Sequence, residues 1–541
     1  MMNVSQDCSA LLFIVTSPYP GVAYEGADFL KRISRLKASA GAVVISEKKS
    51  ALFVDGRYEL AAKLLIDSNK FSIEKLSFEN IAKWIENNLE KETKIAIDYR
   101  FFSINSLNKI KSRLRYYKFT SCDFDKLFNV QKQTRNAKIL EWNIDKNRFD
   151  CILNLINKYN LDGYLICDPC SSAYLLNLRD LNTKNTPVVL GYTLITKDGE
   201  HILYVDNSYN LPYKNIKQLQ NDLTKFQKIG TDFNEAPAFL NYSNFVNIEN
   251  PIINEKCVKS SAEIQNIQEI AKQDSQAIVN FMYWFYHHDD ISEIDCVNKL
   301  FALRRENKDF VSNSFDTIAA ADEHSAIVHY LPTDETNAVI QKFLLLDSGG
   351  QYLYGTTDIT RTFTKIIPTK EEKTYYTLVL KGHIAVANAK LPKDYTGAAL
   401  DVLARQYLWN AGLDYNHGTG HGIGYMLNVH EGPIAISKKN SVPLKANMLL
   451  SNEPGVYFEN HLGIRLENMI VVKDFSENFF AFDTISLIPF DFNFIDVSLL
   501  TREEKKWLIK YHCDISDKLQ LRAEVKSWLT SDIISPFLSL L

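Results

Sequence analysis

The sequence predicts a protein built from several α/β domains, and three observations support this prediction. The 541 residues correspond to three or four domains of about 150 residues each. Strand-like runs at 42–45, 51–54 and 163–166 alternate with helix-like segments at 81–89 and 147–159, as is typical of mixed α/β domains. A hydrophobic share of 46%, with 31 Phe and 27 Tyr, argues against a disordered chain.

Charge and apolar patterning exclude several classes of partner. The formal net charge of −4 argues against nucleic acid as the main ligand. No apolar run reaches the ~18 residues that a membrane span requires, and the apolar stretch 11–15 is too short for the core of a signal peptide. The eight cysteines are spread from Cys8 to Cys513, a pattern expected of reduced thiols. We therefore expect a cytoplasmic protein.

The first two regions, residues 1–135 and 136–252, contain a faint internal repeat. Residues 41–45 lead into 54–60, and residues 191–195 lead into 205–211 with one residue more between the two halves. Two related tandem α/β domains would produce this pattern. Two hairpins that merely share their turn chemistry would produce it as well.

The third region, residues 253–541, is where we expect the chemistry. It opens with a helix-rich stretch at 261–286 and ends with one or two helices and a tail at 499–541. Of the 11 histidines, all but His201 lie in this region. We expect His287, His288 and His512 to be ordinary surface residues.

Two aspartates flank a predicted hairpin in the third region. An apolar strand runs into Asp347, and a β-branched strand leaves from Asp358. A turn near Tyr352 and Leu353 would place the aspartates opposite each other, with Cβ atoms ~4.5–5.5 Å apart. Two buried carboxylates at that distance repel each other unless a cation holds them.

Two glutamates repeat this arrangement further along the chain. A turn at Asn460 places Glu453 opposite Glu467. Strand alternation then directs Arg465 to the same face as Glu467. Between the two hairpins, residues 417–424 hold four glycines and two histidines, which favours close backbone approach over a helix.

Together, the four carboxylates and one histidine would make a mostly oxygen-based ligand set. The four negative charges balance two divalent cations, and two metals ~3.5–4 Å apart are a known catalytic device. Oxygen ligands with one imidazole suit Mn²⁺, while Zn²⁺, Co²⁺ and Fe²⁺ remain alternatives. Each motif alone also has an ordinary structural explanation, such as an aspartate before a glycine-rich turn. Spacing therefore leaves a dinuclear site and a purely structural explanation both open.

At these residues the chain resembles the Xaa-Pro aminopeptidases, a family of pita-bread metallohydrolases. The resemblance is carried by the segments 39–41, 55–58, 174–179, 327–330, 347–352, 355–362, 417–422, 428–433, 452–455 and 463–468. It implies two creatinase-like N-terminal α/β domains, at 1–135 and 136–252. It also implies a pita-bread catalytic domain with a helical tail at 253–541.

The resemblance also implies a role for each motif residue. The metal ligands would be Asp347, Asp358, His421, Glu453 and Glu467. The substrate-binding residues would be Arg57, Phe315, His329, His417, His421, His430 and Arg465. Among these, Arg57 would meet the far end of the peptide, and Phe315 would form part of an apolar wall against proline.

The implied reaction is hydrolysis of the first peptide bond of peptides with proline in the second position. A water activated by two metals would attack the carbonyl. His430 or His329 would stabilise the oxyanion, and Glu453 would carry the proton to the leaving proline nitrogen. We expect a homodimer by the same resemblance. The alternatives are a prolidase that cleaves only dipeptides, a creatinase-like amidinohydrolase and a catalytically silent peptide-binding module.

Overall fold

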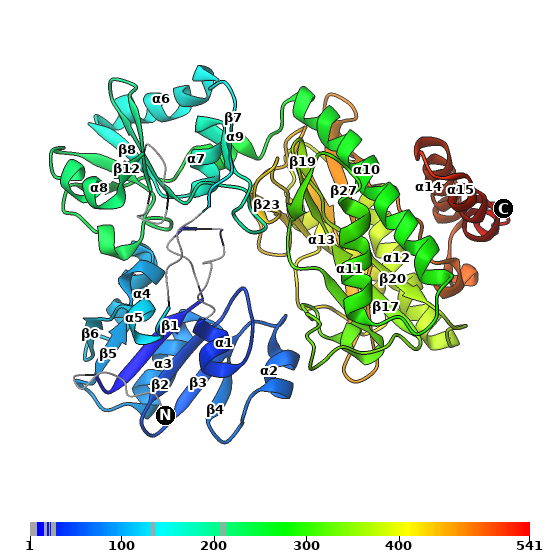
Figure 1. The fold of residues 1–541 in the computed structure, drawn as a ribbon, viewed down its shortest axis with the longest axis horizontal. Coiled ribbons are helices and arrows are strands. Elements are labelled where there is room, and N and C mark those ends of the chain that lie inside the picture. The colour runs from blue at the N-terminus through cyan, green and yellow to red at the C-terminus, as the bar shows by residue number, and fades with distance from the viewer. Residues whose placement is uncertain are drawn as a thin grey trace. The chain divides into compact units, whose positions relative to one another are not determined.

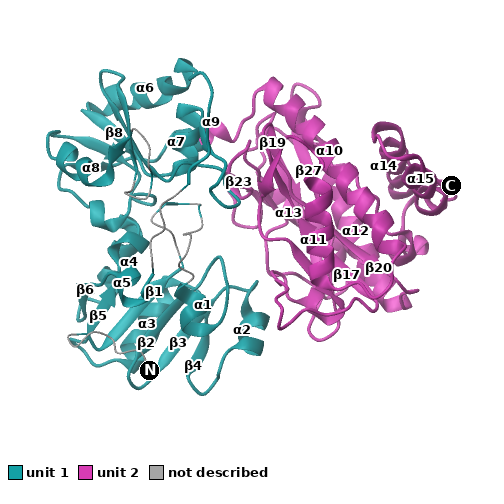
Figure 2. Ribbon diagram, in the orientation of Figure 1, with its two compact units in different colours: residues 1–253 teal, residues 254–541 magenta. Residues whose placement is uncertain are grey.

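A computed structural model describes residues 8–15, 19, 20, 22, 29–130, 136–205, 209 and 213–540 (Figure 1). Its contacts divide the chain into two compact units, residues 1–253 and 254–541 (Figure 2). Helices and sheets alternate in both units, which confirms the predicted α/β class. The expected domain limit at residue 135 and much of the second repeat copy, 206–208 and 210–212, lie outside the described residues.

The first sheet of unit 1 has six strands in the order β4-β3-β2-β1-β5-β6. The strands are β1 (Ala10–Ile14), β2 (Ala42–Ser46), β3 (Ser50–Val54), β4 (Phe71–Lys75), β5 (Lys94–Ile97) and β6 (Lys118–Ser121). The neighbours β1, β2 and β3 pair antiparallel, and the other pairs are parallel. The helices are α1 (Phe29–Ser34), α2 (Glu59–Leu65), α3 (Phe78–Asn88), α4 (Ile104–Arg113) and α5 (Phe124–Leu127).

The second sheet of unit 1 repeats this topology in the order β12-β11-β10-β8-β13-β14. Its strands are β8 (Gly163–Ile166), β10 (Gly191–Thr196), β11 (His201–Val205), β12 (Lys214–Asn215), β13 (Ile229–Thr231) and β14 (Phe245–Asn247). Each strand pair runs in the same relative direction as its counterpart in the first sheet. Two hairpins with similar turns would not produce six matching strands, so the structure favours tandem related folds. The helices α6 (Asp150–Tyr159), α7 (Pro169–Leu176) and α8 (Ile216–Leu223) and the strand pair β7 (Ile139–Glu141) and β9 (Leu178–Asp180) complete this part.

Unit 2 packs long helices against curved antiparallel sheets (Figure 1). The helices are α10 (Ser261–Tyr286), α11 (Glu293–Arg304), α12 (Lys370–Ala387), α13 (Gly397–Trp409) and α14 (Arg502–Lys518), followed by the short α15 (Ala523–Trp528) and α16 (Ser535–Leu538). Helix α10 begins at a capping box formed by Ser260 and Glu263, and it buries Ile278, Phe281 and Phe285. These side chains join one large core with residues from the sheets and from α14. That core supports the strands that carry the candidate site.

The largest sheet of unit 2 has the order β21-β28-β27-β24-β22-β23. Its strands are β21 (Leu391–Pro392), β22 (Gly420–Gly422), β23 (Glu431–Ile436), β24 (Leu449–Asn452), β27 (Asn468–Asp474) and β28 (Phe479–Thr484). A second sheet joins β16 (Ile318–Ala321), β17 (Phe343–Ser348) and β20 (Ile359–Thr364), and a third joins β15 (Phe310–Asn313), β18 (Gly350–Tyr352) and β19 (Gly355–Thr356). The hairpin of β25 (Gly455–Phe458) and β26 (Leu462–Arg465) pairs by itself.

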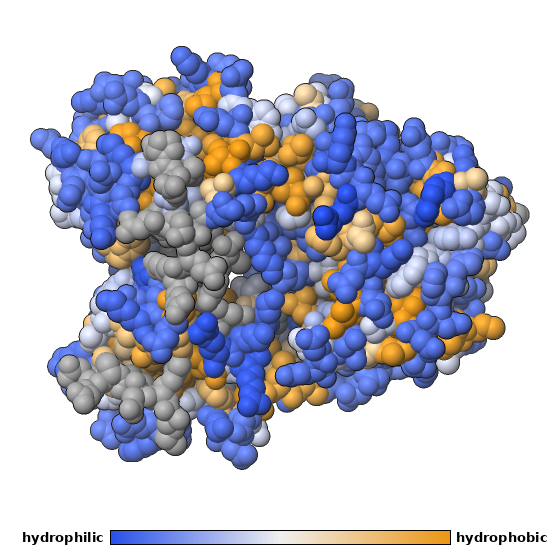
Figure 3. All heavy atoms as spheres, viewed as in Figure 1, coloured by the Kyte–Doolittle hydropathy of each residue, from blue (hydrophilic) through white to orange (hydrophobic). Residues whose placement is uncertain are grey.

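Polar and apolar side chains are interspersed over the face shown in Figure 3. No helix in the described part of the chain combines the length and the apolar character that a membrane span needs. All eight cysteines are free, as expected from their spread along the sequence. The mixture of polar and apolar side chains on this face is in keeping with the ordinary hydrophobic share of the sequence.

His512 is buried, so its predicted surface position is wrong, whereas His287 and His288 are exposed as expected. The ring of His512 stacks on Phe537 at a centroid distance of 3.5 Å. Its Nδ1 lies 2.7 Å from the Leu508 carbonyl oxygen. Burial lowers the pKa of His512 to about 3. The misprediction arose because α14 turns this polar position toward the core, where local hydrogen bonds satisfy the ring.

Candidate metal centre

The first pair of candidate ligands lies on the β17–β20 hairpin, with a register that differs from the prediction. Asp347 pairs with Thr360, so the predicted opposition of Asp347 and Asp358 is wrong. The inner strands β18 and β19 pair Tyr352 with Gly355, which centres the turn one residue later than predicted. A shift of one residue in a turn moves the register by two residues and therefore preserves the face. Asp358 still shares a face with Thr360, and ligand oxygens of Asp347, Asp358 and Glu467 lie within 4.8 Å of one another.

The second pair of candidate ligands keeps the predicted register. Asn452 pairs with Asn468 in one ladder, and Gly455 pairs with Arg465 in the next. Both ladders have the same register, and that register places Glu453 opposite Glu467 between them. The turn falls at Asn460, whose φ of 58° is a left-handed conformation that asparagine tolerates.

His421 on β22 points its ring at one acid from each hairpin. Its Nε2 lies 3.3 Å from Asp358 Oδ2 and 3.3 Å from Glu453 Oε1. Its Nδ1 lies 2.9 Å from the Gly422 carbonyl oxygen, which accepts the Nδ1 proton and leaves Nε2 free to act as a ligand. At Gly420 a Cβ would come within 2.0 Å of the Ser451 carbonyl oxygen. The glycine therefore permits β22 to approach β24 closely enough to present His421.

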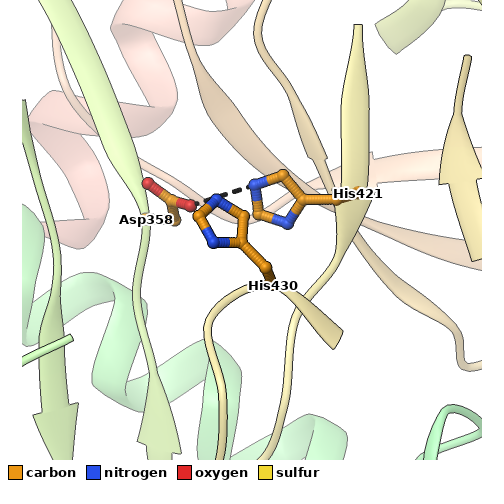
Figure 4. Close-up of side chains that lie close together, drawn as sticks. All are labelled: Asp358, His421 and His430. Carbon is orange, nitrogen blue, oxygen red and sulfur yellow. Dashed lines mark ion pairs between the residues drawn. The ribbon is translucent and has the colours of Figure 1, made fainter. Parts of the chain in front are cut away.

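Three overlapping groups of ligand atoms connect all five predicted ligands. Beside the Asp347–Asp358–Glu467 group, His421 lies with Glu453 and Glu467, and Asp358 lies with His421 and His430. Figure 4 shows the last group, with the rings of His421 and His430 beside the Asp358 carboxylate. The two rings meet edge to face at a centroid distance of 4.3 Å. The structure thus brings together side chains from strands that lie far apart in the sequence.

Burial and neighbouring charges shift the pKa values of the four acids in the site. Burial raises the pKa of Asp347 to about 7, and repulsion from Asp358 and Glu453 adds to this effect against the attraction of Arg465. Burial and neighbouring carboxylates likewise raise the pKa of Asp358 and Glu467. Burial opposes the ionisation of Glu453, but when the His421 ring is protonated, its hydrogen bond and charge lower the pKa of Glu453 to about 2. A site of this kind attracts cations.

Two buried carboxylate oxygens provide an independent test of whether metal ions fit here. Asp347 Oδ1 and Glu467 Oε1 have no hydrogen-bond partner among the described residues. Buried polar atoms are normally paired, so an unpaired carboxylate oxygen needs an explanation. Hard oxygen ligands with one imidazole match the preferences of divalent cations such as Mn²⁺. The donor set therefore fits a pair of divalent metal ions.

A hydrogen-bond chain supports Asp347 from behind. Arg465 donates to Asp347 Oδ2 at 2.6 Å and to the hydroxyl of Tyr457 at 2.7 Å. That hydroxyl in turn lies 2.8 Å from His417 Nε2, and His417 Nδ1 lies 2.7 Å from the Gly418 carbonyl oxygen. Burial lowers the pKa of His417 to about 4, which keeps its ring neutral. Because the proton sits on Nδ1, Nε2 accepts the hydrogen bond of Tyr457.

Tyr457 and Thr360 also contact the candidate ligands or their partners, although neither was predicted from the sequence. Tyr457 lies four residues after Glu453 on the same hairpin, so strand alternation alone could have placed it on the face of the ligands. Thr360 donates from Oγ1 to Glu467 Oε2 at 2.7 Å and pairs with Asp347 in the sheet. It was missed because the predicted register put Asp358 at that position.

A buried charge cluster follows His430 and was not predicted either. Glu431 is 2% exposed and forms ion pairs with Lys259 and, at 3.2 Å, with Lys256. Lys256 ends helix α9 (Ile252–Lys256), and Lys259 comes shortly before α10. The lysines are separated from Glu431 by about 170 residues in sequence, so no local pattern could reveal the contact.

The remaining predicted residues have less direct support. His329 is half-buried in the turn that follows the short 3₁₀ helix Asp322–Ala326, and it belongs to none of the three ligand groups found among the described residues. Phe315 is half-buried before β16, whose Ile318 pairs with Asp347. Arg57 belongs to unit 1 and forms an ion pair with Asp55 at 2.7 Å. Their roles toward a substrate stay predictions.

Four family models match the chain. The model described as metallopeptidase family M24 matches residues 265–474, and a model of the C-terminal region of that peptidase matches residues 478–533. Two models described as creatinase/prolidase N-terminal domain match residues 33–128 and 145–279. The two N-terminal models thus cover strands of both six-stranded sheets of unit 1, and the M24 model covers the candidate site in unit 2.

Relatives of known name are similar over most of the chain. The "Probable Xaa-Pro aminopeptidase P" of Laccaria bicolor is 33% identical over 90% of this chain and 84% of its own length. The "Xaa-Pro aminopeptidase 1" of Dictyostelium discoideum is 34% identical over 90% of this chain and 86% of its own.

Solved structures of two peptidases are also similar to this chain. The X-prolyl aminopeptidase from Caenorhabditis elegans, described as a cytosolic enzyme with a di-nuclear active site, has a TM-score of 0.89 and 26% identity, covering 98% of this chain and 96% of that one. The Xaa-Pro dipeptidase from Bacillus anthracis has a TM-score of 0.52 and 24% identity, and covers 64% of this chain and 98% of that one. The latter similarity shows a shared fold alone.

Proposed function

The chain belongs to the Xaa-Pro aminopeptidases of metallopeptidase family M24, and from this premise we propose how its residues carry out the family's reaction. It is a metal-dependent aminopeptidase that hydrolyses the N-terminal Xaa-Pro bond of peptides. The observation that carries the mechanism is the convergence of four carboxylates and one imidazole from two hairpins and a glycine-rich strand.

The enzyme uses two divalent metal ions, and we assign their ligands as Asp347, Asp358, His421, Glu453 and Glu467. When bound, the ions supply Lewis acidity toward the scissile carbonyl and lower the pKa of a water molecule. We propose Mn²⁺ as the metal because the ligands are mostly oxygens, with Zn²⁺ or Co²⁺ as alternatives. The unpaired oxygens of Asp347 and Glu467 support the assignment of these two residues as ligands.

Glu453 is the residue that we propose as the proton carrier. As a carboxylate with two oxygens, Glu453 can bind metal through one oxygen and accept the proton of the attacking water with the other. The leaving nitrogen of proline has no N–H in the peptide and needs a proton to depart as an amine. Glu453 delivers that proton, while the hydrogen bond from Ser451 Oγ to Glu453 Oε1, 3.2 Å long, steadies the carboxylate.

His430 is the residue that we propose to stabilise the negative charge on the carbonyl oxygen. Its ring lies against His421 yet is exposed on its other side, where a peptide can reach it. We propose that His329 also contacts the substrate, and that Phe315 packs against its proline ring. His417 holds its position through Tyr457, and Arg57 is proposed to contact the far end of longer peptides.

The main alternative is a prolidase, which accepts dipeptides only. Similarity to enzymes named Xaa-Pro aminopeptidase extends over 90% of this chain in Laccaria bicolor and Dictyostelium discoideum, and over 98% in Caenorhabditis elegans, which supports the aminopeptidase. An amidinohydrolase and a silent binding module are disfavoured because all five ligands are present and converge. Hydrolysis of Gly-Pro and Arg-Pro-Pro, measured before chelation, after chelation and after Mn²⁺ is added back, tests these possibilities. Preference for the dipeptide would overturn the proposal.

We also propose a cytoplasmic location and a homodimer. The location is supported by the cytosolic description of the Caenorhabditis elegans neighbour and by the spread of free cysteines. The dimer follows from the resemblance. Light scattering on the eluted peak of a size-exclusion column would give the mass of the protein in solution. A mass of 62.0 kDa, which is that of a single chain, would contradict the dimer.

A further inference from the structure

A fully buried ion pair lies behind the hairpin that carries Asp347 and Asp358. Asp274 of α10 and Arg304 at the end of α11 are both 0% exposed. The guanidinium binds the carboxylate through two nitrogens, with Nε at 2.7 Å from Oδ1 and Nη2 at 3.1 Å from Oδ2. Two charges are seldom buried in a core that apolar side chains could fill, because desolvation offsets much of their attraction. The pair therefore calls for an explanation beyond packing.

Each member of the ion pair also binds the hairpin. Arg304 donates from Nη2 to Ser348 Oγ at 3.1 Å and from Nη1 to the Gly349 carbonyl oxygen at 3.3 Å. Asp274 accepts from the Tyr352 hydroxyl at 2.6 Å and from Thr357 Oγ1 at 2.8 Å. Ser348 directly follows Asp347, and Thr357 directly precedes Asp358. The ion pair thus contacts both limbs of the hairpin at the residues next to the ligands.

The two limbs of the hairpin are also held against each other next to the ligands, at Gly349, Gly350 and Thr357. A Cβ on Gly349 would lie 2.0 Å from the Thr357 carbonyl oxygen, so the limbs approach more closely than any side chain would permit. Thr357 Oγ1 accepts from the Gly350 N–H at 2.8 Å, and Ser314 Oγ donates to the Thr357 carbonyl oxygen at 2.9 Å. The spacing of the two aspartates is therefore set from behind, on the side away from the metals.

We propose that Asp274 and Arg304 are positioning residues that hold Asp347 and Asp358 at the spacing of metal ligands against their mutual repulsion. The inference rests on the proposed function. A bidentate Arg–carboxylate pair has a fixed planar geometry, and its remaining donors and acceptors match the polar groups of both limbs. Contacts that orient a ligand change metal affinity even though they never touch the metal.

The test uses variants that remove contacts to the hairpin and keep the ion pair. Tyr352→Phe removes only the hydroxyl that donates to Asp274, and Thr357→Val removes the second donor together with the acceptor of the Gly350 N–H. Tyr286→Phe is the matched control, because its hydroxyl donates to the carboxylate of Asp491 at 2.7 Å in the same unit. The dissociation constant for Mn²⁺ is measured by equilibrium dialysis of the full chain, and the melting temperature is measured on the chelated protein.

We expect Tyr352→Phe and Thr357→Val to weaken Mn²⁺ binding about tenfold each, the lower end for loss of a ligand-orienting contact. Tyr286→Phe should lower the melting temperature by a similar amount while leaving the Mn²⁺ dissociation constant unchanged. Activity at saturating Mn²⁺ should recover toward the wild-type value in Tyr352→Phe, since the ligands themselves are intact. A purely structural role would change only the melting temperature.

The outcomes separate this inference from the proposed function. Wild-type protein that binds no divalent metal would overturn the proposed function, and the inference with it. Normal wild-type binding with unchanged affinity in Tyr352→Phe and Thr357→Val would overturn the inference alone. If Tyr352→Phe fails to fold, Arg304→Lys decides, because lysine keeps the charge and loses the fork. Unchanged Mn²⁺ affinity in Arg304→Lys would also contradict the inference.

Discussion

Tyr457→Phe tests the hydrogen-bond chain that supports Asp347. The hydroxyl accepts from Arg465 at 2.7 Å and donates to His417 at 2.8 Å. Phenylalanine keeps the ring and leaves one guanidinium N–H and one imidazole nitrogen without this partner. Arg465 is only 1% exposed, so water replaces the hydroxyl poorly. Each of these two unsatisfied buried groups costs about 1–3 kcal/mol, so we expect the free energy of unfolding to fall by about 2–6 kcal/mol.

The same change should also reduce activity. Arg465 loses one of the two contacts that aim it at Asp347, and loss of a contact that orients a metal ligand typically costs about 10–100-fold. Urea unfolding gives the stability, and hydrolysis of a peptide with proline in second position gives kcat/KM at saturating Mn²⁺. The control is Tyr375→Phe, whose exposed hydroxyl contacts Glu371 and should cost less than about 0.5 kcal/mol. Equal losses of stability and activity in the two variants would refute the reasoning.

Three further predictions follow from the same geometry. Asp358→Ala should abolish both metal uptake and turnover, and a normal metal content after dialysis would contradict its assignment as a ligand. Burial lowers the pKa of His383 and His512 to about 3, so each neutral ring should lose about 1.4 kcal/mol of stability as the pH falls from 7.5 to 5.5, through the pKa of the unfolded imidazole. In urea unfolding, His512→Gln should lack its share of this loss, and a pH dependence equal to that of the wild-type protein would contradict a neutral buried ring. Glu431→Gln removes the buried carboxylate that forms ion pairs with Lys259 and Lys256 and should cost about 3–5 kcal/mol in urea unfolding, whereas a loss below about 1 kcal/mol would contradict a stabilising role for these pairs.

Register accounts for what sequence reasoning predicted correctly and incorrectly at the two hairpins. The Glu453–Glu467 hairpin has a clear turn residue, Asn460, and its register follows from counting outward. The Asp347–Asp358 hairpin has no such residue at its tip, and its turn lies one residue later than predicted. The error moved the partner of Asp347 by two positions but kept every side chain on its predicted face.

Contacts between distant segments explain what sequence reasoning missed. Tyr457 was within reach of an alternation argument, because it lies four residues after Glu453 on the same limb of the hairpin. Asp274 and Arg304 were not, since one lies in the middle of α10 and the other at the end of α11, where a charged residue predicts a solvated face. Nothing local marks a charge whose partner lies 30 residues away in a dry core.

The sequence by itself determined the class of the domains and placed paired acids on two hairpins beside a glycine-rich segment with histidines. Strand alternation and turn chemistry convert residue type and spacing along short stretches directly into local structure. The choice of the five candidate ligands came from the resemblance of these motifs to the Xaa-Pro aminopeptidases. Only the tertiary structure decided which acids approach His421, which carboxylate oxygens stay unpaired and which buried charges brace the ligands. Those features arise where strands and helices remote in sequence pack together, and burial turns the resulting proximity into shifted pKa values and metal affinity.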